Sequence, residues 1–372
     1  MPRPILLTIR IDAMRHNVSV VRRAIGQSRV WAVAKANGYG QGIAQAVEGF
    51  ADADGLAVLD LAEAAQARAS GWTKPILMLE GAFAAQDLAE MKHLSASTVI
   101  TSIEQAAMFN NASTVPDSVW IKLNTGMNRL GIPSRENHER LARLTQDLSH
   151  RTQSPIHFMM HFACADMATG WESQFDEFQA TFTALKSGLA TQVGQASLAN
   201  SAALFGHPQT HADWVRPGIA LYGATPFEDA ASAHSAFGLG LKPVQSLTTQ
   251  IIGIQMLKAG DTVGYGARFR ASRPSRIGVI AAGYADGYPR CAPDGTPVWI
   301  AGRRVPIAGR VSMDLMTIDL TDHPEAVVGA SVELWGEHLP IDEVARSCGT
   351  VGYELMTAVM PRVPRKILHG QR

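Results

Sequence analysis

The stretch Arg29-Val-Trp-Ala-Val-Ala-Lys-Ala-Asn-Gly-Tyr-Gly-Gln-Gly42 joins an apolar run to a lysine and then to a glycine-rich segment. The apolar run predicts a buried strand, and the glycines that follow Lys35 predict a loop. A lysine at the end of a buried strand is partly desolvated, which favours the neutral amine that attacks carbonyl groups. The pattern suits a lysine that forms a Schiff base beside a phosphate. A lysine that extends into solvent from an ordinary turn would give the same sequence pattern.

Similar apolar runs recur along the first part of the chain and alternate with helical patterns over residues 61–69, 102–110, 135–148 and 171–189. This alternation is typical of a parallel sheet whose strands are connected by helices. Eight strand candidates predict an α/β fold, a (β/α)8 TIM barrel. They lie near residues 29–35, 55–59, 75–80, 97–101, 118–124, 155–161, 196–201 and 215–222.

The pattern changes after Gly223, where a segment dominated by Ala, Ser and Gly over residues 224–240 predicts a linker. Short strands follow at 244–256, 277–282, 297–300, 305–319 and 331–335, with one short helix at 340–348. We therefore expect a barrel over residues 1–235 and an all-β, barrel-like domain over residues 236–372. A first strand near residues 5–11 is expected to join the β-domain.

The composition points to a small-molecule substrate. The 372 residues contain 33 Lys and Arg against 33 Asp and Glu, so no global field attracts nucleic acid or a membrane surface. Cys164, Cys291 and Cys348 are widely spaced, which argues against a disulfide framework and for a reducing compartment. The N-terminal segment lacks the features of a signal peptide, and no stretch suits a membrane span. We expect a cytoplasmic protein without a metal site.

Polar residues stand at the carboxyl ends of several predicted barrel strands, where barrel enzymes have their active sites. Arg216-Pro-Gly-Ile219 offers backbone N–H groups to a phosphate, and an arginine there also suits the pyridine nitrogen of pyridoxal phosphate. Each residue alone has a structural explanation, such as a buried imidazole, a helix cap or an ion pair. Their convergence at one rim favours a site formed by Lys35, Lys122, Asn124, His161, Asn200, Ser201 and Arg216.

Nearly end to end, the sequence resembles the alanine racemases, a family of fold-type III pyridoxal-phosphate enzymes. The segment Ala32-Val-Ala-Lys-Ala-Asn-Gly-Tyr-Gly-Gln-Gly42 is similar to the family's cofactor attachment motif. One such match is weak evidence, whereas many in the same order are strong evidence. The further similar segments are 121–131 (IKLNTGMNRLG), 161–166 (HFACAD), 199–201 (ANS), 216–223 (RPGIALYG), 263–266 (VGYG), 283–289 (GYADGYP), 309–314 (GRVSMD) and 352–354 (GYE).

The resemblance implies an enzyme that interconverts L-alanine and D-alanine, working as a homodimer whose active sites are shared between subunits. It implies that Lys35 holds the cofactor as a Schiff base and, once the substrate has released it, acts as the base on the D-alanine face. Tyr265, from the β-domain of the partner subunit, is implied as the base on the L-alanine face. The implied cofactor contacts are Tyr39, Ser201, Gly218, Ile219 and Tyr353 to the phosphate, with Arg216 at the pyridine nitrogen.

The resemblance also assigns Arg129 and the backbone of Met313 to the substrate carboxylate. Behind these contacts it implies four further residues: Lys122, His161, Asp314 and Tyr284, the last at the access channel. Lys122 is expected to take up carbon dioxide and become N6-carboxylysine. Three departures from the family pattern stand at Asn124, Gly38 and Gln41, in place of the commoner Asp, Ala and His. Because Asn124 lacks a charge, it affects the expected charge balance around Lys122.

Several functions stay open at this point. The product serves either as D-alanine for peptidoglycan or as L-alanine for catabolism, and a racemase of broader specificity has the same motifs. A fold-type III decarboxylase shares the two-domain plan. A pyridoxal-phosphate binding protein without catalysis would instead be a single barrel, without the β-domain that carries Tyr265 and Met313.

Overall fold

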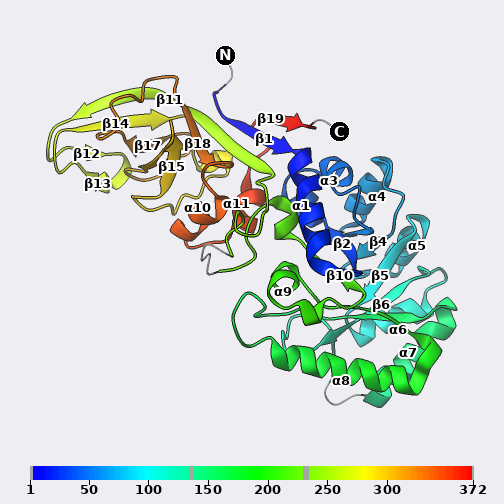
Figure 1. Ribbon diagram of the computed structural model, residues 1–372. Coiled ribbons are helices and arrows are strands. Elements are labelled where there is room, and N and C mark those ends of the chain that lie inside the picture. The colour runs from blue at the N-terminus through cyan, green and yellow to red at the C-terminus, as the bar shows by residue number, and fades with distance from the viewer. Residues whose placement is uncertain (1–2, 135–137, 229–233, 371–372) are drawn as a thin grey trace.

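The computed structural model describes residues 3–134, 138–228 and 234–370. Eight parallel strands form a closed barrel (Figure 1), since each strand pairs with the next and the eighth pairs with the first. The expected (β/α)8 barrel is therefore confirmed. Its strands are β2 (Arg29–Val33), β3 (Gly55–Val58), β4 (Ile76–Met78), β5 (Ala96–Ile100), β6 (Val119–Asn124), β8 (Ile156–Met159), β9 (Val193–Ser197) and β10 (Trp214–Val215), and a short β7 (Ile132–Pro133) pairs with β6 outside the ring.

Two barrel strands end before the positions expected from the sequence. Strand β9 stops at Ser197, and Asn200 instead caps the helix that follows, with its side chain accepting a hydrogen bond from Ala203 N. Strand β10 stops at Val215, because Pro217 has no N–H to continue the ladder. Residues 219–222 form the 3₁₀ helix η3 (Ile219–Tyr222). The expected strand residues Ser201 and Ile219 therefore lie at helix starts beyond the sheet.

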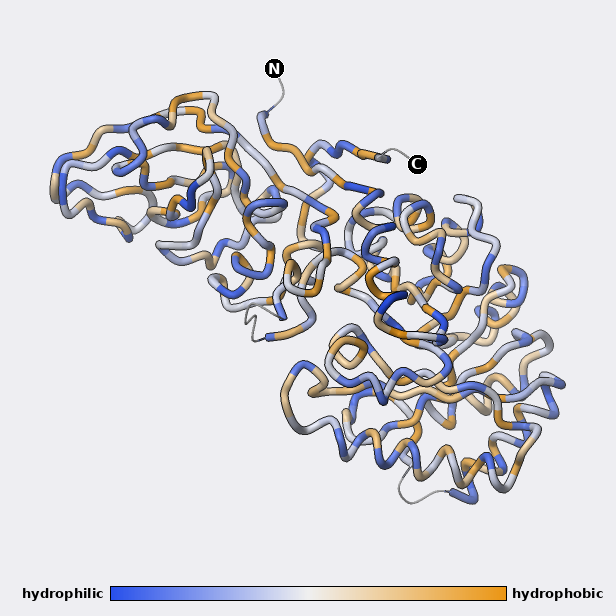
Figure 2. The backbone as a smooth tube through the Cα atoms, viewed as in Figure 1, coloured by the Kyte–Doolittle hydropathy of each residue, from blue (hydrophilic) through white to orange (hydrophobic). Residues whose placement is uncertain are grey.

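Helices surround the barrel, and Figure 2 shows apolar and polar segments alternating along them, as expected for helices with one face against a sheet. The start of the helix expected over residues 135–148 lies outside the described residues, and the described helix begins at His138. The helices of this part are α1 (Ile11–Ile25), α2 (Lys35–Tyr39), α3 (Ile43–Gly49), α4 (Leu61–Ala69), α5 (Ala85–His93), α6 (Ile103–Asn111), α7 (His138–Thr152), α8 (Glu172–Leu189), α9 (Ser201–Gly206), η1 (Ala190–Gln192) and η2 (Pro208–Thr210).

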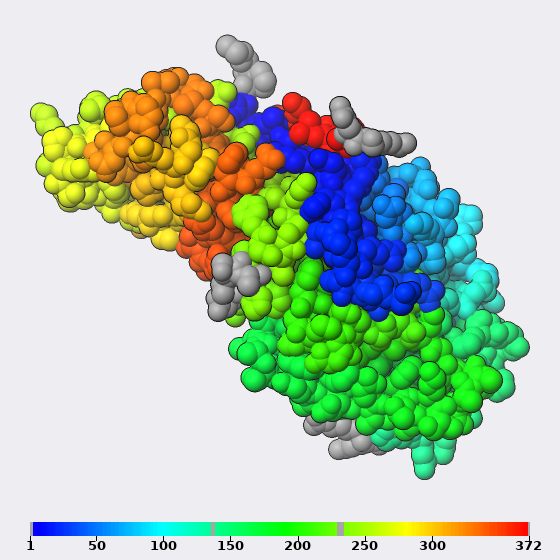
Figure 3. All heavy atoms as spheres, viewed as in Figure 1, coloured from blue at the N-terminus to red at the C-terminus, as the bar shows by residue number. Residues whose placement is uncertain are grey.

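A second sheet follows, with the order β16-β15-β18-β11-β1-β19 and with β14 joining β11 to β17. The first strand of the chain, β1 (Leu6–Arg10), belongs to this sheet and pairs with β11 and β19. Figure 3 accordingly shows the blue segment that contains β1 and the red segment near the other end of the chain side by side. The other strands are β11 (Gln245–Leu257), β14 (Ser275–Ile280), β15 (Pro297–Ile300), β16 (Arg303–Pro306), β17 (Met316–Asp319), β18 (Ser331–Trp335) and β19 (Arg365–Leu368), and β12 (Thr262–Val263) pairs with β13 (Phe269–Arg270).

This second unit differs from its expected form in two respects. The single strand expected over residues 305–319 is two strands, because Pro306 ends β16 and Gly309 adopts a φ of 95° in the connecting loop. The unit is mainly β rather than all-β, since α10 (Ile341–Ser347) is followed by a second helix, α11 (Gly352–Ala358). The 3₁₀ helices η4 (Tyr265–Ala267) and η5 (Tyr284–Asp286) complete it.

One continuous apolar core extends from the barrel through α11 into the second sheet. It includes Leu7 and Ile9 of β1 as well as Leu355 and Met356 of α11, all of them buried. The barrel rim and the second unit are therefore packed against each other. Among the described helices, none has the length and apolar character needed to cross a membrane.

Candidate active site

A cavity of about 340 Å³ opens at the carboxyl ends of the barrel strands. Its size lies at the lower end of the range of roughly 300–1,000 Å³ that is usual for small-molecule sites. Most of its wall comes from the loops after the strands, and α11 of the second unit contributes one side chain. Ten of the expected site residues line it: Lys35, Tyr39, Lys122, Arg129, His161, Asn200, Ser201, Arg216, Gly218 and Tyr353.

Lys35 begins a turn with an unusual backbone. The four residues Ala36, Asn37, Gly38 and Tyr39 have φ values of 53°, 55°, 61° and 51°, the left-handed helical region. This region costs an L-residue roughly 1–2 kcal/mol, so several such residues in a row are strained. Strain of this kind concentrates at functional sites. The turn reverses the chain at once after the strand and brings Lys35 and Tyr39 into the same cavity.

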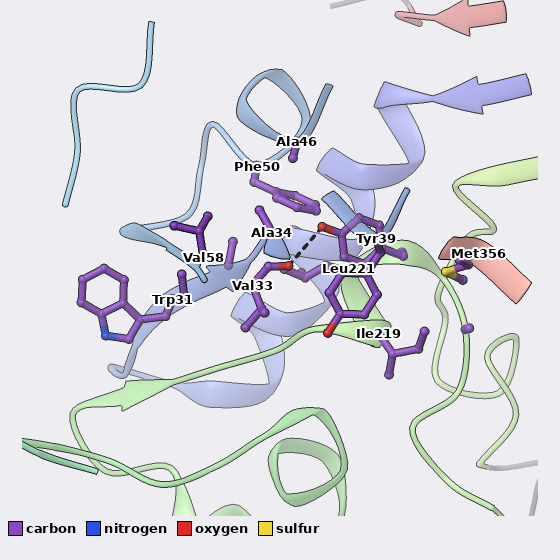
Figure 4. Packing of buried hydrophobic residues seen from close by; sticks show 14 of the residues in the cluster. Trp31, Val33, Ala34, Tyr39, Ala46, Phe50, Val58, Ile219, Leu221 and Met356 are labelled. Atoms are coloured by element: carbon purple, nitrogen blue, oxygen red, sulfur yellow. Dashed lines mark hydrogen bonds between the residues drawn. The ribbon is translucent and has the colours of Figure 1, made fainter. Parts of the chain in front are cut away.

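Neighbouring elements hold this turn in place. A Cβ on Gly40 would lie 2.6 Å from Met356 O of α11, so a larger residue is excluded by the close approach of that helix. Arg365 of β19 donates a hydrogen bond to Gly40 O at 2.8 Å. Figure 4 shows the Tyr39 ring packed beside Val33, Ile219 and Leu221 in the apolar core. The second unit thus supports the turn that carries the lysine.

Tyr39, Gly218 and Ser201 form one polar corner of the cavity. A Cβ on Gly218 would lie 2.4 Å from the Tyr39 hydroxyl oxygen, so only glycine fits beneath that group. Ser201 Oγ accepts a hydrogen bond from Gly218 N at 2.9 Å, and Ile219 follows, fully buried. The Tyr353 ring lies 5.8 Å from the Tyr39 ring. Burial raises the pKa of Tyr39 and of Tyr353, so both phenols stay protonated and act as hydrogen-bond donors.

Arg216 lies at the base of the cavity and is nearly completely buried. Its guanidinium donates hydrogen bonds to Ser197 Oγ at 2.6 Å, to Met160 O at 2.5 Å and to Leu198 O at 3.1 Å. Burial lowers the pKa of Arg216 to about 9, which leaves it charged near neutral pH. Burial, followed by the charge of Arg216, lowers the pKa of His161 well below its usual range, so the imidazole is neutral.

The cavity is strongly cationic around Lys122. Burial, followed by the nearby charges of Arg216 and Arg129, lowers the pKa of Lys122 to about 8. A lysine with such a pKa has a substantial neutral fraction near physiological pH. Glu80, at the end of the segment expected as the third barrel strand, is a carboxylate in the cavity wall and opposes this shift. Glu80 was not among the residues expected from the sequence, although a charged residue at the end of a barrel strand was the available signal.

Asn124, which differs from the commoner aspartate, has a local structural role. Its Oδ1 accepts hydrogen bonds from Gly126 N at 3.1 Å and Asn128 N at 3.0 Å, and its Nδ2 donates to Asn128 Oδ1. These bonds shape the turn that leads to Arg129. An amide supplies both the donor and the acceptors that this turn uses, whereas a carboxylate would supply only acceptors.

Asn124 and Ile219 of the barrel are not among the residues that line the cavity, and the same holds for four further expected site residues: Tyr265, Tyr284, Met313 and Asp314. All four belong to the second unit. The Tyr265 side chain is 73% exposed in η4, and Figure 1 shows the neighbouring β12 and β13 at the end of the molecule away from the barrel. Met313 is 53% exposed, and its carbonyl accepts a hydrogen bond from Ala285 N beside Tyr284. Within one chain, therefore, Tyr265 does not reach the cavity that contains Lys35.

Buried charges support the exposed pair of loops that carry Tyr284 and Met313. Asp286 is fully buried and accepts hydrogen bonds from Arg3 at 2.9 Å, Arg362 at 2.8 Å and Gly283 N at 2.9 Å. Asp314 pairs with Arg362 at 2.6 Å. The position of both loops is thus fixed by ion pairs to segments near the two ends of the chain.

Known proteins match the chain over almost its whole length. Residues 9–226 match the N-terminal domain of alanine racemase, and residues 244–367 match its C-terminal domain. The chain belongs to the alanine racemase family. The family and the enzyme class expected from the sequence, an isomerase, are therefore confirmed.

Individual members of the alanine racemase family agree with this assignment. The chain is 47% identical over 368 residues to an alanine racemase of Nitrosomonas eutropha, covering 98% of this chain and 99% of the relative. It is 49% identical to one of Burkholderia mallei with the same coverage. The solved biosynthetic alanine racemase of Pseudomonas aeruginosa has a TM-score of 0.90 and 46% identity, with 99% of this chain and 100% of that chain covered. The Acinetobacter baumannii alanine racemase also has a TM-score of 0.90, at 32% identity, with 98% and 100% of the two chains covered.

Proposed function

We propose that this protein interconverts L-alanine and D-alanine with pyridoxal 5′-phosphate, using Lys35 of one subunit and the partner subunit's Tyr265 as its two bases. The observation that carries the proposal is the cavity in which Lys35 stands on a strained turn beside a polar corner and a buried arginine. Membership of the alanine racemase family supports the reaction and the substrate.

The residues of the cavity fit the cofactor. A phosphate suits the corner formed by the Tyr39 hydroxyl, Ser201, the backbone at Gly218 and Ile219, and Tyr353, because this corner offers donors and only a glycine leaves the space free. Lys122, Arg129 and Arg216 add positive charge around an anionic ligand. The amine of Lys35 is the group that would hold the aldehyde.

Bound in this way, pyridoxal phosphate withdraws electrons from the amino acid and makes its Cα proton acidic. Arg216 would present its fixed positive charge to the pyridine nitrogen, where it would disfavour a proton and limit side reactions such as transamination. Arg129 and the backbone of the partner subunit's Met313 hold the substrate carboxylate. These contacts present the Cα hydrogen to the bases on either side.

Two bases on opposite faces account for inversion. The partner subunit's Tyr265 removes the Cα proton of L-alanine, and Lys35 delivers a proton to the other face; the reverse exchange converts D-alanine. His161 lines the cavity with a neutral imidazole, whose pKa is lowered by burial and then by the charge of Arg216. Lys122, with its neutral fraction, is suited to take up carbon dioxide and become the anion that orients Arg129.

The position of Tyr265 supports a homodimer with shared active sites. Tyr265, Tyr284, Met313 and the adjacent Leu315 are exposed on the second unit of an isolated chain, and together they form an apolar surface suited to a second copy. We propose a cytoplasmic enzyme that supplies D-alanine for cell-wall peptidoglycan or L-alanine for catabolism. Asp314, held by Arg362, fixes the loop that carries Met313.

Formation of D-alanine from L-alanine by the pure protein with pyridoxal phosphate tests the proposal. We expect racemisation in both directions, its complete loss in Lys35→Ala, and loss of the visible absorbance of the bound cofactor in the same variant. Release of carbon dioxide without D-alanine would favour a decarboxylase, and racemisation of larger amino acids at equal rates would favour broader specificity. Binding of the cofactor with no turnover of any amino acid would contradict the enzyme assignment.

A further inference from the structure

Glu63, in the first turn of α4, bonds to the backbone of the turn that carries Lys35. Its Oε1 accepts a hydrogen bond from Asn37 N at 2.8 Å. Its Oε2 accepts from Leu59 N at 3.2 Å and from Asp60 N at 3.4 Å, the latter as part of the capping box of α4. One carboxylate therefore connects the loop after β2 to the loop after β3. Neither its position in the sequence nor the family motifs singled it out.

The left-handed turn needs such an anchor. Ala36, Asn37 and Tyr39 carry a Cβ and still adopt positive φ values, so the turn persists only where its surroundings fix it. The Asn37 side chain already caps α3 by accepting a hydrogen bond from Ile43 N at 3.1 Å. The backbone N–H of Asn37 donates to Glu63, and a hydrogen bond to a carboxylate is stronger than one to a neutral acceptor.

We propose that Glu63 is a positioning residue that holds the left-handed turn and thereby places Lys35 and Tyr39 for cofactor binding. The cofactor part of this inference rests on the proposed function, whereas the backbone part concerns the chain alone. Glu63 itself is not among the described residues that line the cavity, so it acts through the turn and not by contact with the ligand.

The next helix of the barrel offers a matched control. Asp87 occupies the same position in the first turn of α5, and its Oδ2 accepts hydrogen bonds from Phe83 N at 2.9 Å and Ala84 N at 2.8 Å. Like Glu63, it is half-buried. Its described hydrogen bonds stay within its own loop and do not include the Lys35 turn. Replacing Asp87 therefore removes a comparable helix cap while leaving the turn untouched.

The test compares Glu63→Ala, Glu63→Gln and Asp87→Ala with the wild type by two measurements. The first is amide hydrogen exchange over residues 36–42 in the cofactor-free protein, and the second is the dissociation constant of pyridoxal phosphate measured by absorbance. We expect Glu63→Ala to speed exchange at Asn37 and to weaken cofactor binding roughly 10- to 100-fold, the factor that corresponds to a lost charge-assisted hydrogen bond. Glu63→Gln, which keeps one acceptor, should lie in between.

Asp87→Ala is expected to lower the melting temperature, with exchange at residues 36–42 and cofactor affinity unchanged within twofold. Equal weakening of cofactor binding in Glu63→Ala and Asp87→Ala would assign the effect to lost helix caps and overturn the inference. Unchanged exchange at Asn37 in Glu63→Ala would overturn it as well. If the wild type binds no pyridoxal phosphate, the proposed function fails, while the exchange comparison still decides the role of Glu63.

Discussion

Replacing Gly218 by alanine should push Tyr39 out of the polar corner of the cavity. The new Cβ would lie 2.4 Å from the Tyr39 hydroxyl oxygen and 3.3 Å from Cζ, well inside van der Waals contact. The ring has little room to retreat, because Tyr222 stacks on it at 4.5 Å and Tyr353 lies 5.8 Å away. Either the tyrosine or the backbone at Gly218 must therefore move.

The expected size of the effect follows from this geometry. Forcing an additional methyl group into a packed site costs about 1–3 kcal/mol of the free energy of unfolding. The displaced hydroxyl also loses its hydrogen bond to the phosphate, and a hydrogen bond to a charged group corresponds to a loss of cofactor affinity of roughly tenfold or more. Both effects should appear in the same variant.

Urea unfolding of the cofactor-free protein and titration with pyridoxal phosphate measure the two effects. The control is Gly188→Ala in α8, where the added Cβ meets no described atom within 4 Å. This change should raise the free energy of unfolding by about 0.5–1 kcal/mol. Adding Tyr39→Phe to Gly218→Ala removes the clashing oxygen and should restore part of the lost stability without restoring cofactor affinity. A double variant no more stable than Gly218→Ala, or normal cofactor binding in Gly218→Ala, would show that a clash with the Tyr39 hydroxyl does not govern this corner.

Three further results are expected. Tyr265→Phe should slow removal of the Cα proton from L-alanine far more than it weakens cofactor binding. The rate is measured by exchange of this proton for deuterium, and an unchanged rate would exclude the role of Tyr265 as a base. Asp286→Ala leaves the Gly283 N–H without its buried acceptor and removes the partner of Arg3 and Arg362. It should lower the free energy of unfolding by about 1–3 kcal/mol in urea, and a loss no larger than that of a surface carboxylate would be incompatible with the ion-pair network. Burial raises the pKa of Asp342 to about 6, so the folded chain prefers the protonated acid and stability falls as pH rises from about 4 to about 6. Asp342→Asn, which keeps an acceptor for Thr225 N, should therefore stabilise the protein at about pH 8 and not at about pH 4, and equal gains at both values would contradict this cause.

The barrel could be predicted from the sequence because its strands are buried on both faces and are therefore continuous apolar runs. The predicted strand ends were less accurate where polar side chains, and not a neighbouring strand, form hydrogen bonds with the backbone. Asn200 shows this, since its side chain caps α9 at a position that the apolar pattern had assigned to a strand. The β-domain was predicted less completely, and α11 was missed although it contributes Tyr353 to the cavity.

The candidate site was predictable where residues stand at strand ends, as with Lys35, Lys122 and Arg216. The left-handed turn was not, because Asn37 and Gly38 favour a positive φ but Ala36 and Tyr39 do not, so the local pattern carries no signal for four such residues in a row. Glu63 was missed for a related reason, since a glutamate in the first turn of a helix is explained by capping alone. Its hydrogen bond to Asn37 depends on how two neighbouring loops meet, which local sequence does not encode.

The central claim is that one active site uses Lys35 of one subunit and Tyr265 of the other. Lys35→Ala and Tyr265→Ala proteins, each inactive alone, should regain activity when their subunits are mixed and allowed to exchange. Random pairing makes about half of the dimers mixed, each with one intact site, so about one quarter of the wild-type racemase activity is expected. Mixed dimers verified by mass spectrometry that remain inactive would contradict the account.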